Sequence, residues 1–175
     1  MGTRFDKVIN RTGTYSTQWD FAEDRFGKND VLPFSISDMD FQSPNEILQV
    51  MDEYVKHGVF GYTRWNHSEY KSAITHWYKS RFAVNMPADW IVYSPSVIYS
   101  ISKLIEILTD ETDKVILQTP GYDAFFKQLN ASGREMIKNP LTYKNGSYSI
   151  DFNLLEKQLS HPKSKVMLFC NPHNP

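Results

Sequence analysis

The sequence predicts an α/β fold in which a mostly parallel sheet is flanked by helices, with an irregular N-terminal arm and a helix in front of it. Three observations predict it. From residue 91 onward, short apolar runs alternate with longer segments of helical period. The runs at 115–117 and 166–169 are continuously apolar, as in strands covered on both faces. Residues 1–42 show no sustained period. Alternating strands and helices give a parallel sheet with right-handed crossovers.

Two helices are expected before the sheet. The first begins at Ser43, where Ser43 and Glu46 have capping-box spacing and Pro44 occupies the first helical position. Gly58 gives it a C-terminal stop. The second helix opens at residues 66–69 and is broken by the Pro-containing stretch 85–89.

The predicted sheet follows these helices. We expect strands at 91–93, 114–119, 134–138 and 165–170, and helices at 96–108, 122–131 and 152–160. Asn145-Gly146 separates two short runs, at 141–144 and 147–150, and predicts a hairpin turn between them.

Composition excludes several classes of protein. The net charge is -1 and the basic residues are scattered, so we expect no nucleic-acid partner and no attachment to an anionic membrane. No apolar run is long enough to span a bilayer. Cys170 is the single cysteine, which rules out an internal disulfide and favours a reducing, cytoplasmic location.

The junction before the 96–108 helix is a candidate phosphate site. Ser96 stands at the N-cap position, and Val97 and Ile98 begin the helix directly after the strand expected at 91–93. Free backbone N–H groups and the positive end of the helix dipole meet there. An ordinary capped turn that binds nothing has the same pattern.

Other catalytic patterns are missing. Cys170 and His173 suggest a thiol–imidazole pair, but no third group orients them. The remaining histidines lack metal-ligand spacing, so we expect no metal site. Neither a Gly-x-Gly-x-x-Gly nor a Walker A sequence is present.

Five segments, taken together and in order, resemble the MalY/PatB group of cystathionine β-lyases, which belongs to the class I/II aminotransferase superfamily of pyridoxal-phosphate (PLP) enzymes of fold type I. The resemblance runs from about Phe5 to the last residue. The segments are VLPFSISDMDF at 31–41, HGVFGYTRW at 57–65, SPSVIY at 94–99, TPGYDAF at 119–125 and CNPHNP at 170–175.

The resemblance implies a PLP site. Ser96, Val97 and Ile98 match the segment that holds the cofactor phosphate, although many relatives have glycine where this chain has Val97. Tyr122 matches the aromatic residue that stacks on the pyridine ring, and Asn174 matches the residue that hydrogen-bonds its phenolic oxygen. From spacing alone, Tyr122 also suits a core position, and the segment around Asn174 also suits a simple turn.

The resemblance further implies a homodimer with a shared active site, because Tyr62 matches a tyrosine that reaches the neighbouring subunit's cofactor phosphate. An exposed or interface aromatic in a glycine-containing loop is the alternative. Asp38 and Asp40 match a segment at the edge of the substrate entrance, and we assign neither a proton-transfer role.

The implied activity is α,β-elimination of cystathionine-like amino acids to a thiol, pyruvate and ammonia. A class I/II aminotransferase and a non-catalytic regulatory protein on the same fold are the alternatives. Lys103, Lys114 and Lys165 do not match the lysine that forms the Schiff base with PLP. We therefore expect the chain to be an inactive N-terminal fragment, with residues 1–60 contributing to the small domain and dimer interface and 61–175 forming the first half of the large PLP-binding domain.

Overall fold

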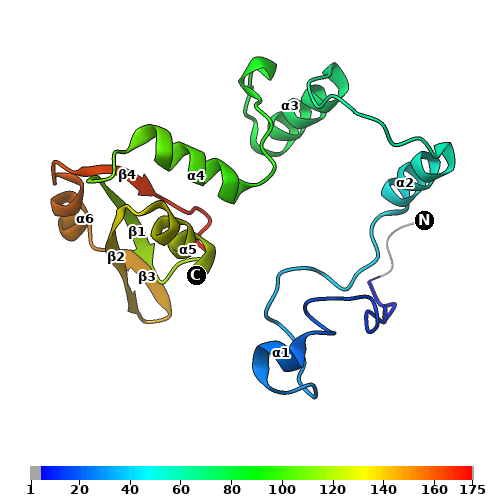
Figure 1. Cartoon of the computed structure of the whole chain (residues 1–175), viewed down its shortest axis with the longest axis horizontal. Helices are drawn as coiled ribbons and strands as arrows, with labels where there is room; N and C mark the ends of the chain where they lie inside the picture. The colour runs from blue at the N-terminus through cyan, green and yellow to red at the C-terminus, as the bar shows by residue number, and fades with distance from the viewer. Residues whose placement is uncertain (1–4, 175) are drawn as a thin grey trace. The chain divides into compact units, whose positions relative to one another are not determined.

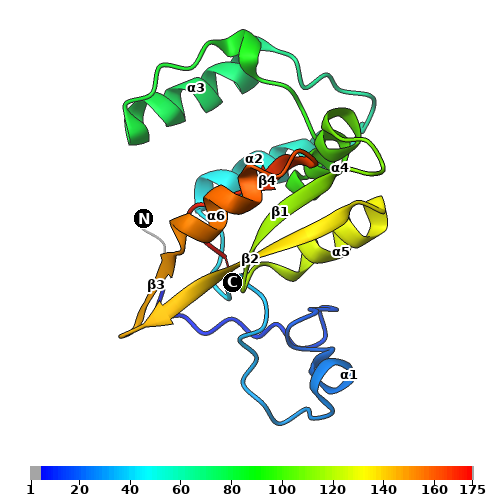
Figure 2. The same ribbon diagram turned by 90° about the vertical axis from the view of Figure 1, so that its left-hand side faces the viewer.

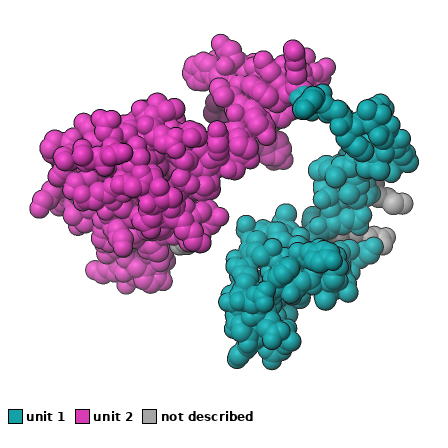
Figure 3. Space-filling view, in the orientation of Figure 1, with its two compact units in different colours: residues 1–63 teal, residues 64–175 magenta. Residues whose placement is uncertain are grey.

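The computed structural model describes residues 5–174 and divides the chain into two compact units, Met1–Thr63 and Arg64–Pro175 (Figure 3). The second unit contains the sheet. The first unit contains two helices joined by irregular chain.

The sheet of the second unit has four strands in the order β3-β2-β1-β4 (Figure 1). β1 lies between β2 and β4 and runs parallel to both, while β3 pairs antiparallel with β2. This confirms the predicted fold class, a mostly parallel sheet with a hairpin at Asn145-Gly146. The strands are β1 (Lys114–Thr119), β2 (Glu135–Lys144), β3 (Ser147–Ile150) and β4 (Ser164–Leu168).

Helices cover both faces of this sheet, as Figures 1 and 2 show. They are α4 (Val97–Leu108), α5 (Asp123–Ser132) and α6 (Phe152–Leu159). Ile105 of α4 and Leu129 of α5 pack on Val115 and Leu117 of β1, and these four side chains form the buried core. Successive strand residues point to opposite faces, so Ile116 lies on the other side, which α6 covers.

Arg134 fastens the C-terminal ends of α4 and α5 to each other. Its guanidinium donates to the carbonyl and the hydroxyl of Thr109, both at 3.2 Å, and to the carbonyl of Ser132 at 2.7 Å. A cation is favourable where helix carbonyls lack partners. Both helices therefore end at the edge of the sheet where β2 begins.

The strand predicted at residues 91–93 is wrong. The chain forms a short 3-10 helix, η1 (Ala88–Trp90), and then continues extended with Val92 81% exposed. Three apolar residues make a strand only where a neighbouring strand pairs with them, and the described part of the chain supplies none. The strand predicted at 134–138 instead continues to Lys144 and provides the first arm of the hairpin.

The helix before this segment is α3 (Ser68–Phe82), which begins where the sequence places it. The His67 ring nitrogen accepts from the backbone N–H of Tyr70 at 3.3 Å and caps its first turn.

The first unit contains α1 (Ala22–Phe26), which the sequence does not predict, and α2 (Asn45–His57). The predicted cap of α2 is wrong, since Pro44 is the N-cap residue and no side chain bonds the first turn. Gly58 ends the helix in the left-handed conformation, as predicted. Within residues 5–174, no helix combines the length and apolar character needed to cross a membrane.

Candidate cofactor-binding site

Three segments of the second unit meet at the carboxyl edge of the sheet. Because α4 and α5 both end beside Arg134 at the opposite edge, both helices begin at the carboxyl edge. The chain after β4 also leaves the sheet there, since β4 runs parallel to β1. The chain passes from β1 to β2 on one side, while β4 lies on the other. A crevice at such a reversal of strand order is the usual ligand position in open α/β sheets.

The start of α4 presents the predicted phosphate-binding residues. The Ser96 hydroxyl accepts from the backbone N–H of Tyr99 at 3.1 Å, which fixes the first turn. Val97 and Ile98 lie in that turn, where backbone N–H groups have no partner within the helix. Val97 is 71% exposed, and no acidic residue lies in the first turn to offset the helix dipole.

Tyr122 lies at the N-cap of α5, directly after the end of β1, and its side chain is 40% exposed. Its ring meets Phe125 edge to face, with centroids 5.4 Å apart. Gly121 holds this turn close to the strand, because a Cβ atom at that position would lie 2.8 Å from the backbone oxygen of Gln118. The turn that carries Tyr122 therefore requires glycine at this position.

Asn174 lies in the turn that follows β4. His173, the residue before it, bonds the carbonyl oxygen of Pro120 through Nε2 at 2.8 Å. This contact brings the Asn174 turn beside the turn that leads to Tyr122. The Cys170 thiol donates to the Pro172 carbonyl at 3.4 Å. Cys170 and His173 thus bond different backbone oxygens, and these bonds do not join them as a thiol–imidazole pair.

Tyr62 lies in the first unit and its side chain is fully exposed. It lines an open pocket of about 470 Å³ together with Glu53, Tyr54 and His57 of α2. The structure thus brings Ser96, Val97, Ile98, Tyr122 and Asn174 to one edge of one sheet, and Tyr62 belongs to the other unit.

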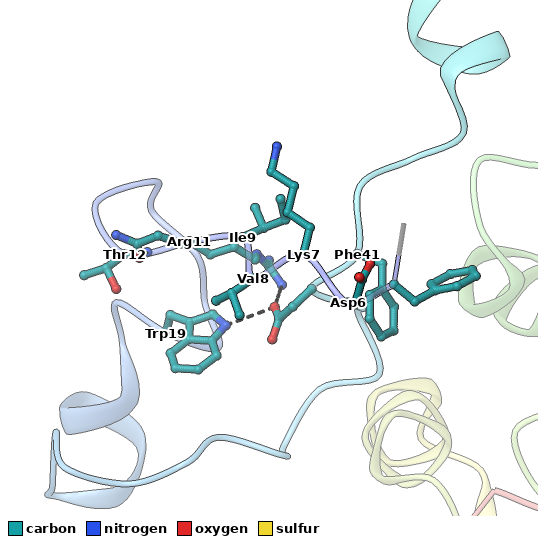
Figure 4. Close-up of a pocket in the computed structure, with 11 residues that line it drawn as sticks. Asp6, Lys7, Val8, Ile9, Arg11, Thr12, Trp19 and Phe41 are labelled. Atoms are coloured by element: carbon teal, nitrogen blue, oxygen red, sulfur yellow. Dashed lines mark hydrogen bonds and ion pairs between the residues drawn. The ribbon is translucent and has the colours of Figure 1, made fainter. Parts of the chain in front are cut away.

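An ion-pair cluster in the first unit joins residues far apart in the sequence, so local patterns do not reveal it. Figure 4 shows Arg11 and Trp19 of this cluster. Arg11 contacts Asp38 at 2.6 Å and Asp40 at 2.7 Å, and the Trp19 indole N–H donates to Asp40 at 3.0 Å. Arg11, and after it Trp19, lower the pKa of Asp40, and the two carboxylates raise the pKa of Arg11. These bonds hold the residue 38–40 segment against the arm, and ionised Asp40 is a poor proton donor. Within the described residues, no three His, Cys, Asp or Glu side chains gather as a metal site would require.

The family model for "Aminotransferase class I and II" matches residues 29–175. Two curated relatives align over 171 residues, which is 98% of this chain and 44% of each relative. Protein MalY of Escherichia coli is 41% identical, and cystathionine beta-lyase PatB of Bacillus subtilis is 38% identical. The chain thus spans less than half the length of these relatives.

Solved structures agree with the fold. Cystalysin from Treponema denticola, described as containing a pyridoxal 5′-phosphate cofactor, superposes with a TM-score of 0.91 at 34% identity, over 100% of this chain and 45% of that one. The PLP-bound C-S lyase of Staphylococcus hominis gives a TM-score of 0.90 at 27% identity, over 100% of this chain and 44% of that one. The resemblance inferred from the five segments is confirmed, and the chain belongs to the class I and II aminotransferase family.

Proposed function

We propose that the intact protein is a PLP-dependent carbon–sulfur β-lyase that converts cystathionine-like amino acids to a thiol, pyruvate and ammonia. The observation that carries the proposal is the 38% identity to cystathionine beta-lyase PatB over 98% of this chain. The PLP-bound C-S lyase structure, which aligns with the whole chain, supports it further.

The residues at the carboxyl edge fit the phosphate of PLP. We propose that the Ser96 hydroxyl and the backbone N–H groups of Val97 and Ile98 bind it. A hydrogen bond to a charged group contributes about 1.5–3 kcal/mol. The helix dipole adds about 0.3–1 kcal/mol, so the direct bonds dominate. The absence of an acidic side chain from the first turn of α4 suits an anionic ligand.

The same edge offers groups for the pyridine ring. We propose that the half-exposed Tyr122 stacks on the ring and that the amide of Asn174 donates to its phenolic oxygen. The Gly121 close approach supports this, because it fixes the turn from which Tyr122 projects. When bound, PLP supplies an electron sink for the carbanion that forms at the substrate α-carbon. The protein residues hold and orient the ring.

We propose that the functional unit is a homodimer in which Tyr62 reaches the partner subunit's phosphate. Tyr62 is fully exposed, and α2 also has exposed apolar side chains, among them Met51 and Val55. Residues 1–60 would then form part of the small domain and dimer interface, and residues 61–175 the first half of the large PLP-binding domain. The free thiol of Cys170 suits a cytoplasmic location. Light scattering of the purified protein tests the dimer, and a monomer would refute it.

Activity of the full-length protein tests the main proposal. We expect bound PLP, seen as visible absorbance, and pyruvate release from cystathionine without any keto-acid acceptor. Turnover that requires a keto acid would identify an aminotransferase instead, and PLP binding without turnover would favour the regulatory alternative. The 175-residue chain alone should release no pyruvate, because no lysine in it matches the Schiff-base position.

A further inference from the structure

Among the residues that the structure describes, the His173 side chain makes one polar contact, and that contact defines its tautomer. Nε2 lies 2.8 Å from the carbonyl oxygen of Pro120. A carbonyl oxygen only accepts hydrogen bonds, so Nε2 carries the proton. Nδ1 is buried and has no partner among the described residues. Any hydrogen-bonding role of the ring among the described residues is therefore the bond from Nε2 to Pro120.

This hydrogen bond connects the turn after β1 to the turn after β4, beyond the point where the two strands stop pairing. The parallel ladder between β1 and β4 ends at the pair Leu117 and Leu168. Beyond Leu168 the chain turns toward Asn174, and beyond β1 it turns toward Tyr122. The His173–Pro120 bond spans 53 residues of sequence and joins these turns past the end of the ladder.

We propose that His173 is a positioning residue for the cofactor ring, which it holds through its neighbours. Asn174 follows His173 directly, and Tyr122 follows Pro120 after Gly121. The hydrogen bond between His173 and Pro120 therefore fixes the positions of Asn174 and Tyr122 relative to each other. The Asn174 amide would reach the edge of the ring, and Tyr122 would cover its face. The inference rests on the proposed function, because PLP is the ligand that needs both groups.

The bond itself is tested without cofactor. Nitrogen NMR of the protein should show His173 as the Nε2–H tautomer. The Nδ1–H tautomer would overturn the inference, because Nε2 could then not donate to Pro120.

The positioning role is tested with two substitutions of equal length. His173→Gln keeps an N–H near the position of Nε2, whereas His173→Met has similar bulk and no donor. We expect His173→Met to weaken PLP binding to the full-length protein by roughly 2- to 10-fold, the effect of one lost hydrogen bond. Its PLP absorbance should shift in the same direction as that of Asn174→Ala. His173→Gln should remain close to the wild type in both measurements.

A double variant separates positioning from a general loss of stability. If His173 acts through Asn174, adding His173→Met to Asn174→Ala should change the absorbance no further. Fully additive effects, or equal spectra for His173→Gln and His173→Met, would overturn the inference even if both variants melt at lower temperature. A wild-type protein that binds no PLP would instead refute the proposed function and the positioning role with it, while the tautomer measurement would still decide whether the His173–Pro120 bond forms.

Discussion

Replacing Gly121 with alanine should displace the turn that carries Tyr122. The added Cβ would lie 2.8 Å from the Gln118 backbone oxygen and 3.5 Å from the Phe126 ring. An ordinary contact needs about 3.4 Å, so the turn must move by about 0.6 Å. Because the opposing atom belongs to the backbone of β1, it cannot rotate away. Overpacking of this kind reduces the free energy of unfolding by about 1–3 kcal/mol.

The displacement should also weaken PLP binding. Loss of one aromatic stacking contact, about 0.5–1.5 kcal/mol, corresponds to roughly a 2- to 10-fold increase in Kd. Urea unfolding measures the stability change, and titration with PLP measures the affinity change. Gly61→Ala is the matched control, because Gly61 has no positive φ and a Cβ there meets nothing within 4 Å. A Gly121→Ala protein that unfolds like the Gly61→Ala protein would refute the close approach.

Three further tests address the fold. Leu129→Ala empties a fully buried core position and should reduce the free energy of unfolding by about 2–5 kcal/mol. The control Leu104→Ala, at a half-exposed site on α4, should reduce it much less. Equal losses in the two variants would contradict the core assignment. Arg134→Met removes the charged donor that bonds the buried Thr109 and should reduce the free energy of unfolding by about 1.5–3 kcal/mol. An unchanged midpoint in thermal or urea unfolding would contradict the link between the C-terminal ends of α4 and α5. Backbone N–H groups, first that of Gly13, lower the pKa of Asp20 below its ordinary value of 3.8, so this stabilisation is present above that pH and lost as pH falls through the lower folded pKa. The protection of the amides in that loop, measured relative to their intrinsic exchange rates at each pH, should therefore fall in acid, and Asp20→Asn should remove this fall; unchanged protection in the wild type would contradict it.

Local patterns were sufficient to predict most of the sheet and its helices. α4 begins after Ser96 because its hydroxyl caps the helix, and α5 ends at Gly133, which adopts the left-handed conformation. Asn145-Gly146 forms the predicted hairpin turn. Each of these features depends on residues within a few positions of each other, which a single sequence displays directly.

Features that depend on distant contacts could not be predicted in this way. The Arg11 cluster joins residues 27 and 29 positions apart, and no local pattern links Arg11 to the two carboxylates. The residue 91–93 segment has strand-like composition, but within residues 5–174 no strand lies beside it to pair with it. In the candidate site, resemblance supplied the residues, whereas the His173–Pro120 bond and the Gly121 close approach required three-dimensional structure.

The sheet can accept a further parallel strand at one edge, beside β4. Within residues 5–174, β4 hydrogen-bonds to β1 on one side, and its outer row of amides and carbonyls has no strand beside it. The opposite border is the four-residue antiparallel β3. An additional parallel strand would dock along β4, and its carboxyl end would lie near the turn that contains His173. In concentrated solution, the same exposed border is a template for intermolecular pairing, so its coverage decides whether the protein remains dispersed.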